Sequence, residues 1–260
     1  MNAPGLNRSR QFLTNGATSG IFVTGTDTGV GKTTVTAALA MSLKQRGINV
    51  GVMKPVETGC TPKDSDLLAH DAAFLMACAG VSDSMDAVCP FRYRRPLAPA
   101  VASQLDPGPP CSSQAIIDAF VNLAPQHTFT LVEGAGGLAV PLDGTTLTSH
   151  LVAGLGLPLL IVARPGLGTI NHTVLTVAFA LAAGIDVFGI VVNGMPDNPD
   201  DAERTNPEQI TAITGVPVIA ILPFDPENDP QQMRVGGRYL DAVDNTLTPT
   251  LLSVITGTDG

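Results

Sequence analysis

Short runs of apolar residues alternate along the chain with segments whose apolar residues recur at helical spacing. The apolar runs predict strands at residues 21–25, 48–53, 129–133, 159–163, 187–193 and 216–221. Helical spacing predicts helices between them, at residues 31–46, 64–79, 112–123, 170–183 and 203–214. The strands are almost continuously apolar instead of alternating, which is typical of strands covered on both faces.

This alternation of strands and helices predicts βαβ units and therefore an α/β fold with a mostly parallel sheet flanked by helices. We expect a flexible tail at residues 1–19 and a single domain over residues 20–260. The proline-rich stretch at residues 90–110 contains interleaved apolar residues and three arginines. It is interpreted as an ordered loop of that domain and not as a linker.

Charge narrows the classes of partner. The 260-residue chain has 14 Lys+Arg against 23 Asp+Glu, a net charge of −9, and its hydrophobic fraction of 44% is too high for intrinsic disorder. Only 14% of the residues are charged, compared with about 25% in typical soluble domains. An acidic chain without a basic cluster is a poor candidate for binding nucleic acid or anionic membranes. We therefore expect neither partner.

Several absences point to a cytoplasmic protein. No apolar run reaches the roughly 18 residues of a membrane helix, and residues 1–19 lack the apolar core of a signal peptide. The cysteines form no C-x-x-C pair and are interpreted as reduced residues instead of disulfides or zinc ligands. They are Cys60, Cys78, Cys89 and Cys111.

One glycine-rich segment, from Gly25 to Thr34 (GTDTGVGKTT), lies between the first predicted strand and the first predicted helix. This is the position of a phosphate-binding loop, in which backbone N–H groups cradle phosphates, a lysine bridges the outer phosphates and the next hydroxyl can hold Mg²⁺. The strict pattern has glycine where this chain has Thr26. The residues expected to bind nucleotide are nevertheless present: Gly29, Val30, Gly31, Lys32, Thr33 and Thr34.

A phosphate loop by itself does not define the reaction, because ATPases, GTPases, kinases, ligases and partition switches share it. The guanine signature N-K-x-D is missing, since Asn193 is followed by Gly-Met-Pro. This favours adenine, though only weakly.

Four further motifs closely resemble those of the dethiobiotin synthetase family, and the similarity runs from about residue 20 to residue 228. They are Val52–Gly59 (VMKPVETG), Asp64–Asp66 (DSD), Leu131–Gly137 (LVEGAGG) and Gly166–His172 (GLGTINH). The resemblance implies a homodimeric ligase that uses ATP and Mg²⁺ to convert 7,8-diaminononanoate and CO₂ or bicarbonate to dethiobiotin in biotin synthesis. The implied route passes through a carbamate and a carbamic-phosphoric anhydride.

The resemblance also implies roles for individual residues. Those expected to be catalytic are Lys32, Lys54 and Thr28, and those expected to hold Mg²⁺ are Thr33, Asp66 and Glu133. Contacts with the nucleotide are expected from Asp66, Glu133, Gly134, Ala135, Gly136, Asn193, Gly194, Leu222, Pro223 and Phe224. Contacts with the substrate are expected from Thr58, Gly168 and Asn171.

Physical arguments support some of these roles and leave alternatives for others. Lys54 ends a predicted strand, and phosphoryl transfer needs fixed positive charge. Glu133 ends an apolar strand, where a buried acid is costly without a cation. Asp66 could instead belong to the first turn of the following helix, where acids suit the helix dipole. Gly168 and Asn171 could mark an ordinary helix start instead of a site for the substrate carboxylate.

Two rival classes share the loop. A partition or septum-placement ATPase usually carries a further lysine where this chain has Asp27 and often a C-terminal amphipathic membrane helix, yet residues 240–260 have no basic face. A corrin-amidating ligase needs a glutaminase domain, for which the chain is too short, so that a separate subunit would have to provide it. One departure from the dethiobiotin synthetase pattern is Gly29, where some members carry an acid that could contribute to substrate or nucleotide binding.

Overall fold

Six parallel strands form the central sheet of the computed structural model, which describes residues 20–64, 66–144 and 146–256. Their order is β12-β11-β10-β1-β7-β2, and every neighbouring pair is parallel. The expected α/β fold is therefore confirmed, while the tail expected at residues 1–19 lies outside the described residues. The strands are β1 (Gly20–Gly25), β2 (Val50–Met53), β7 (Phe129–Glu133), β10 (Leu159–Ala163), β11 (Val187–Met195) and β12 (Val218–Pro223).

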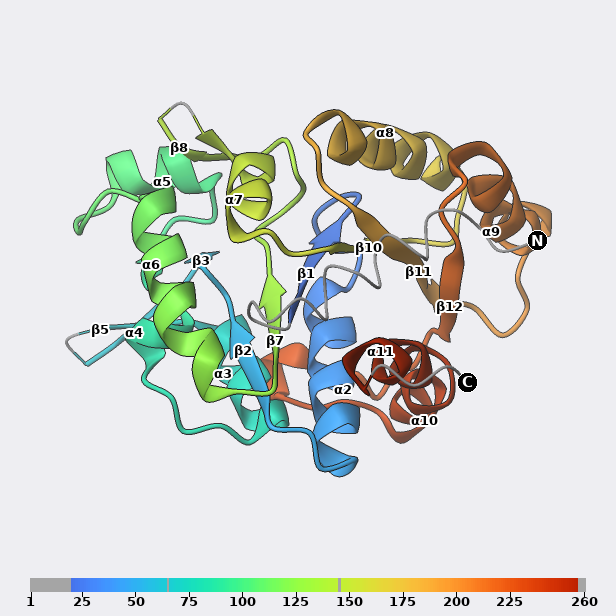
Figure 1. Cartoon of the computed structure of the whole chain (residues 1–260), viewed down its shortest axis with the longest axis horizontal. Coiled ribbons are helices and arrows are strands. Elements are labelled where there is room, and N and C mark those ends of the chain that lie inside the picture. The colour runs from blue at the N-terminus through green and yellow to red at the C-terminus, as the bar shows by residue number, and fades with distance from the viewer. Residues whose placement is uncertain (1–19, 65, 145, 257–260) are drawn as a thin grey trace.

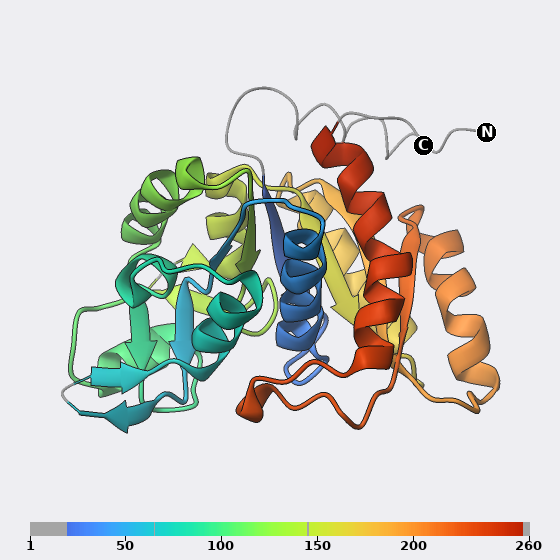
Figure 2. The ribbon, with the colours of Figure 1, turned by 90° about the horizontal axis from the view of Figure 1, so that it is seen from below.

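Helices cover both faces of this sheet (Figure 1, Figure 2). One buried cluster joins the sheet to α2, α3, α10 and α11, and a second joins it to α6, α7, α8 and α9. Because successive strand residues point to opposite faces, Ile21 and Val23 belong to the first cluster and Phe22 to the second. The helices are α2 (Lys32–Gln45), α3 (His70–Ala79), α6 (Ser113–Leu123), α7 (Thr148–Leu155), α8 (Thr169–Ala182), α9 (Asp201–Thr214), α10 (Gly237–Asn245) and α11 (Leu247–Thr256).

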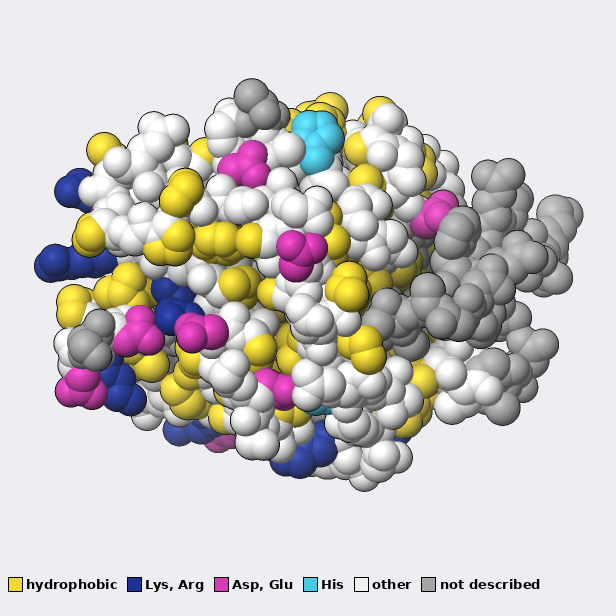
Figure 3. Space-filling view, turned by 60° about the vertical axis from the view of Figure 1, so that its left-hand side comes forward, with side chains coloured by type: hydrophobic (Ala, Val, Ile, Leu, Met, Phe, Trp, Pro, Cys, Tyr) yellow, Lys and Arg dark blue, Asp and Glu magenta, His cyan; other side chains and the backbone are white. Residues whose placement is uncertain are grey.

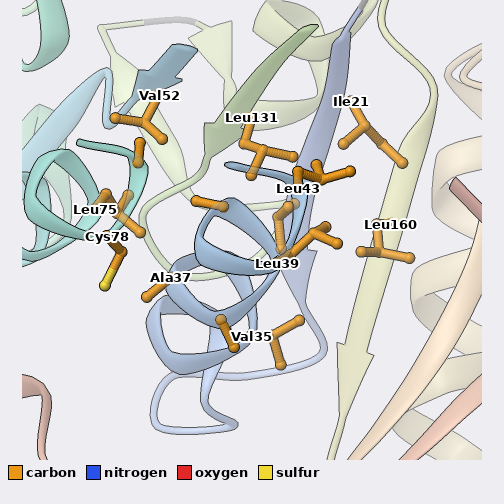
Figure 4. Packing of buried hydrophobic residues seen from close by; sticks show 14 of the residues in the cluster. Ile21, Val35, Ala37, Leu39, Leu43, Val52, Leu75, Cys78, Leu131 and Leu160 are labelled. Carbon is orange, nitrogen blue, oxygen red and sulfur yellow. The ribbon is translucent and has the colours of Figure 1, made fainter. Parts of the chain in front are cut away.

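Helix α2 is packed into the centre of the first cluster. Its side chains Val35, Leu39 and Leu43 lie beside Ile21 of β1 and Leu131 of β7 (Figure 4). Burial of this much apolar surface fixes the helix against the sheet. The N-terminus of α2 is thereby held at the carboxyl edge of the strands, where α/β sheets bind ligands.

Smaller elements lie beside the sheet and were not all expected. Residues 90–110 are ordered, as expected, but they include a strand and a helix. The chain contains further elements outside the predicted ones, notably α7, α10 and α11. The smaller elements are β3 (Val56–Thr58), β4 (Thr61–Lys63), β5 (Asp66–Leu68), α4 (Met85–Val88), β6 (Phe91–Tyr93), α5 (Pro99–Leu105), η1 (Ala124–Gln126), β8 (Pro141–Asp143), β9 (Thr146–Leu147) and η2 (Pro230–Gln232).

The helix predicted over residues 64–79 is wrong in its first part. Residues 66–68 form β5, which pairs antiparallel with β4, and α3 begins only at His70. The backbone N–H and C=O groups of this segment are used in the hairpin and are not available to a helix. A helical pattern of apolar residues therefore extended the prediction beyond the true N-terminus.

Candidate active site

The phosphate loop connects β1 to α2, as the sequence predicts, and two glycines explain its shape. A Cβ at Gly25 would lie 2.7 Å from Val30 Cγ2 and 2.8 Å from the Asp27 carbonyl oxygen. Glycine at position 25 thus allows the loop backbone to approach closely. The strict pattern has its glycine one position later, where this chain has Thr26. Gly31, the N-cap of α2, has a φ of 90°, which favours glycine.

Glu133 is the centre of a polar cluster beside this loop. The Thr33 hydroxyl donates to Glu133 Oε1 at 2.8 Å, and Lys54 Nζ donates to the same oxygen at 2.5 Å. Lys54 Nζ also binds Asp71 Oδ2 at 2.8 Å. The side chains of Lys54 and Glu133 are 5% and 0% exposed. Lys54, which directly follows β2, therefore meets residues of β7, α2 and α3 at one partly buried cluster.

The charges in this cluster stabilise one another. Burial by itself lowers the pKa of Lys54, but the carboxylates of Glu133 and Asp71 outweigh it and raise the pKa above its usual range. Burial raises the pKa of Asp71, but the Lys54 charge outweighs it, so that the pKa is lowered. Lys54 is therefore a protonated cation at neutral pH and lies between Glu133 and Asp71.

Lys32 of the phosphate loop is buried nearby. Its Nζ donates to the Asp27 carbonyl oxygen at 3.0 Å, so that the side chain folds back over the loop. Burial, opposed by the charge of Glu133, lowers the pKa of Lys32. A desolvated cation at a helix N-terminus is well suited to binding an anion.

Glu57 contacts the helix that carries Asp71, a role that the sequence did not predict. Its carboxylate accepts the backbone N–H groups of Asp71 and Ala72, both at 3.0 Å. These groups belong to the first turn of α3, whose N-cap residue Ala69 makes no side-chain cap. Glu57 therefore caps α3 and fixes Asp71, a second unanticipated residue, against Lys54. No motif marks Asp71, and the misplaced helix start gave no hint of it.

The residues fit a magnesium ion that also binds phosphate. Glu133 Oε2 is buried and has no hydrogen-bond partner, which is costly for a carboxylate oxygen unless a cation is nearby. No group of three or more His, Cys, Asp or Glu side chains in the described part of the chain could hold a metal. A metal here would therefore need oxygen ligands from Thr33 and from a nucleotide, a combination that Mg²⁺ accepts.

Two hollows flank the phosphate loop. The first has a volume of about 470 Å³ and is lined by Thr28, Gly29, Gly31, Lys32, Thr33, Thr34, Lys54, Val56, Glu57, Thr58, Asp71, Ala135, Gly136 and Pro230. Residues expected to bind nucleotide and Thr58, expected to bind substrate, therefore share one cavity. The second, also about 470 Å³, is more apolar and is lined by Gly25–Thr28, Gly136–Val140, Leu175, Thr176 and Phe179.

Other expected residues lie away from the cluster. Asp66 is an exposed residue of β5 and accepts from Arg92 Nη2 at 3.2 Å and 3.3 Å, so the structure does not bring it to Thr33 and Glu133. Gly168 and Asn171 lie at the start of α8, outside both hollows. Packing explains why position 134 is a glycine, because a Cβ there would lie 2.8 Å from Phe22 Cε1.

The residues expected around the base lie at the ends of β11 and β12. Asn193 Nδ2 donates to the Val30 carbonyl at 2.9 Å, which ties β11 to the phosphate loop. Gly194 follows it with a φ of 86°. Leu222 is buried, whereas the side chain of Phe224 is 60% exposed. An exposed aromatic ring directly after β12 is available to a planar ligand.

A larger hollow of about 1030 Å³ lies apart from the phosphate loop. It is lined in part by Asp66, Arg92, Arg94 and Arg95, and Arg92 is neutralised there by Asp66 and Asp86. On the corresponding side of the molecule, Figure 3 shows acidic, basic and hydrophobic side chains intermixed without a continuous basic patch. None of the residues of the Glu133 cluster lines this hollow.

Two further properties bear on the expected class of protein. The four cysteines are buried and free. None of the described helices combines the length and apolar character needed to span a bilayer.

The fold and the loop together define a P-loop nucleotide-binding protein, and a family model described as an AAA domain matches residues 19–232. The chain is 43% identical over 204 residues to the ATP-dependent dethiobiotin synthetase BioD of Bacillus subtilis subsp. natto, covering 78% of this chain and 87% of that protein. It is 41% identical over 214 residues to the enzyme of the same name from Thermodesulfovibrio yellowstonii, covering 79% and 89%. The chain belongs to the dethiobiotin synthetase family.

The solved structures resemble it only in fold. The MinC:MinD cell division protein complex of Aquifex aeolicus matches with a TM-score of 0.57 and 14% identity, over 93% of this chain and 97% of that chain. Such low identity shows a shared architecture and carries no argument about activity.

Proposed function

We propose that the chain catalyses the ATP- and Mg²⁺-dependent carboxylation and ring closure of 7,8-diaminononanoate to dethiobiotin. Relatives that are 41–43% identical are named ATP-dependent dethiobiotin synthetases, which supports this proposal. The observation that carries the proposal is the Glu133 carboxylate, which binds both Thr33 of the phosphate loop and Lys54 of the motif VMKPVETG. A general nucleotide switch has no need of a second buried lysine from that motif.

The proposed reaction has three steps. One substrate amine adds to CO₂ and loses a proton, which gives a carbamate. A carbamate oxygen attacks the γ-phosphorus of ATP, and ADP leaves, which gives a carbamic-phosphoric anhydride. The second amine attacks the carbamoyl carbon, phosphate leaves with the bonding electrons, and loss of a proton completes the cyclic urea.

Lys32 and Lys54 provide fixed positive charge for the second step. Lys54 stays protonated at neutral pH because Glu133 and Asp71 raise its pKa, and it lines the same cavity as Lys32. Preorganised charge aimed at a reacting phosphoryl group is worth about 10²–10³ in rate. Thr28, in the same cavity, offers a further hydrogen bond to the reacting phosphate.

Mg²⁺ would be held by Thr33 and Glu133, and when bound it neutralises charge on the phosphates. The motif pattern adds Asp66 as a third ligand, for which the β4–β5 hairpin would have to release Asp66 from Arg92. Gly136 and Ala135 allow the backbone to approach the phosphates closely. Asn193, Gly194 and the segment Leu222–Phe224 would contact the adenine.

The substrate would occupy the space between the phosphate loop and α8. Thr58 offers a hydroxyl to an amine or the carbamate. The N-terminus of α8, with Gly168 and Asn171, suits the substrate carboxylate because its free N–H groups favour anions. The apolar hollow lined by Leu175 and Phe179 suits the aliphatic chain.

Assembly and location complete the proposal. Leu175 and Phe179 of α8 are 60% and 37% exposed, and Leu167, just before α8, is 88% exposed. Exposed apolar residues gathered beside a site favour an interface, and we assign this one to a second copy of the chain. Free buried cysteines support a reducing compartment, the cytoplasm.

Phosphate release from ATP tests the function directly. We expect release, and dethiobiotin detected by mass spectrometry, only when the diamine, CO₂ and Mg²⁺ are all present. Lys32→Ala should abolish turnover while the fold, monitored by circular dichroism, is retained. Rapid ATP hydrolysis without the diamine, stimulated by DNA or lipid, would contradict the proposal and favour the partition-type switch.

A further inference from the structure

The hydroxyl group of Tyr239 lies at the point where the C-terminal helices meet the nucleotide site. The Tyr239 side chain is 1% exposed, and its hydroxyl donates to Asn193 Oδ1 at 2.5 Å. Burial raises the pKa of Tyr239 above its usual range. The hydroxyl therefore remains a hydrogen-bond donor throughout the neutral range.

This bond fixes the orientation of the Asn193 amide. Asn193 Nδ2 donates to the Val30 carbonyl oxygen at 2.9 Å. In the reversed orientation Oδ1 would face that carbonyl oxygen, and two acceptors would repel each other. Donation from Tyr239 to Oδ1 adds a second reason for the observed orientation. The amide thus has one donor and one acceptor in fixed positions.

The same amide fills the space over the last glycine of the phosphate loop. A Cβ at Gly31 would lie 2.1 Å from Asn193 Nδ2. The peptide between Val30 and Gly31 is therefore held both by a hydrogen bond and by packing. Gly31 is the N-cap of α2, so this contact supports the backbone that presents N–H groups to phosphate.

Helix α10 is itself anchored to the segment that follows β12. Asp225 is 6% exposed, and its Oδ2 accepts the Tyr239 backbone N–H at 3.1 Å. Asp225 comes directly after Leu222–Phe224. The start of α10 therefore connects the segment Leu222–Phe224, which is proposed to border the base, to Asn193, which is proposed to contact it.

We infer that Tyr239 is a positioning residue for nucleotide binding, which acts through Asn193 on the phosphate loop and on the choice of base. The inference rests on the proposed function, because the role of Asn193 toward adenine belongs to it. Asn193 keeps one Nδ2 hydrogen and one Oδ1 lone pair for a ligand. A fixed donor and acceptor match N7 and the N6 amino group of adenine, whereas guanine presents acceptors at both N7 and O6.

Tyr239→Phe tests this role, because it removes the hydroxyl and keeps the packed ring. We expect the KM for ATP to rise by about two- to tenfold, as for the loss of one buried hydrogen bond. The preference for ATP over GTP in kcat/KM should fall by a similar factor, since only the Val30 carbonyl then holds the amide in the observed orientation. The kcat at saturating ATP and the KM for the diamine should change little.

The matched control is Tyr93→Phe. Tyr93 is also 1% exposed, and its hydroxyl donates to the Pro109 carbonyl at 3.0 Å, away from the phosphate loop. Its removal should leave the ATP KM and the base preference unchanged. In an Asn193→Ala background, Tyr239→Phe should add no further effect, because a residue that acts through another is not additive with it.

Several results would overturn the inference. The first is an unchanged ATP KM and base preference in Tyr239→Phe, whether or not its melting temperature is lower. The second is an equal effect of Tyr93→Phe, and the third is full additivity of Tyr239→Phe with Asn193→Ala. Should Tyr239→Phe fail to fold, an unchanged ATP KM in Asn193→Ala overturns it as well. Equilibrium binding of ATP separates the two proposals. If the wild-type protein makes no dethiobiotin but Tyr239→Phe still weakens ATP binding, the proposed function fails and the inference stands.

Discussion

Lys54 combines near-complete burial with a full charge, and it is held between Glu133 and Asp71 at 2.5 Å and 2.8 Å. Such a cation is stable only because its partners compensate for the lost hydration. Its removal leaves two carboxylates without their cation. The residue therefore contributes to stability as well as to the proposed chemistry.

Lys54→Met should lose both contributions. We expect kcat to fall by about 10²–10³ and the free energy of unfolding to fall by about 3–5 kcal/mol, the usual cost of breaking a buried ion pair from one side. Steady-state kinetics and urea unfolding measure the two effects. Lys44→Met, at an exposed position of α2, serves as the control. A folded Lys54→Met with wild-type kcat would refute the role.

Asp66 and Asp71 are the acids on which motif and structure disagree, and a pair of variants separates them. Asp71→Asn should lower kcat by about tenfold, because Asp71 binds Lys54 at 2.8 Å and outer ligands commonly contribute 10- to 100-fold. If Asp66 is a metal ligand, Asp66→Asn should raise the Mg²⁺ concentration needed for half-maximal phosphate release. An unchanged requirement would exclude Asp66 from the metal site and leave Asp71 as the second acid of the cluster, beside Glu133.

At the scale of elements, α3 depends on a residue outside the helix. Its N-cap, Ala69, offers no side-chain acceptor, and Glu57 of β3 accepts two of its free N–H groups. Helix α9 is different, because Asp200 and Glu203 form a capping box within the local sequence. The sequence pattern locates α9 to within two residues but misplaces the start of α3 by six, because only α9 carries its own start signal.

Glu57→Ala should therefore affect both stability and the site. We expect the free energy of unfolding to fall by about 1–3 kcal/mol, because buried N–H groups lose their acceptor, and kcat to fall because Asp71 is no longer fixed. Glu57→Gln, which keeps one carbonyl oxygen, should be intermediate. The control is Asp200→Ala, which should cost about 1 kcal/mol without changing kcat. Wild-type stability of Glu57→Ala would contradict the capping role.

At the scale of the whole molecule, the exposed apolar residues of α8 predict self-association. Phe179→Asp should convert the proposed dimer to a monomer, because a charge in an apolar interface is not compensated. Analytical ultracentrifugation measures the change. Ile213→Asp, at a position of α9 that is 57% exposed, should leave the assembly unchanged. A wild-type protein that is monomeric at micromolar concentration would exclude the dimer.

The buried thiols predict a loss of stability at alkaline pH. Burial raises the pKa of Cys78 from 9.0 to about 11 and that of Cys60 and Cys111 to about 12. Unfolded thiols ionise first as the pH rises, so the stabilisation is complete below pH 9.0 and is lost toward pH 12. The raised pKa of Lys54 acts in the same direction.

Urea unfolding at neutral pH and at about pH 10.5 measures this effect. We expect a lower free energy of unfolding at the higher pH. Cys60→Ala should show a smaller decrease, because one of the buried thiols is gone. Equal stability at the two pH values would contradict the assignment of buried, protonated thiols.

The sequence by itself determined the architecture and most of the nucleotide site. Apolar runs located all six strands of the sheet, since a strand buried on both faces must be apolar along its whole length. The phosphate loop could also be predicted, because Gly31, Lys32 and Thr33 are consecutive in the sequence and therefore form a motif that is recognised without the tertiary structure.

Only the tertiary structure decided which distant side chains meet. Asp71 lies 38 residues from Thr33, Glu57 lies 76 residues from Glu133, and Tyr239 lies 206 residues from Thr33. No motif marks Asp71 or Tyr239, and the motif VMKPVETG contains Glu57 without indicating its contact with α3. The fold brings them to the site because parallel strands end at one edge of the sheet, while α3 and α10 pack against α2 behind it. Contacts of this kind depend on packing between elements, which local sequence patterns do not encode.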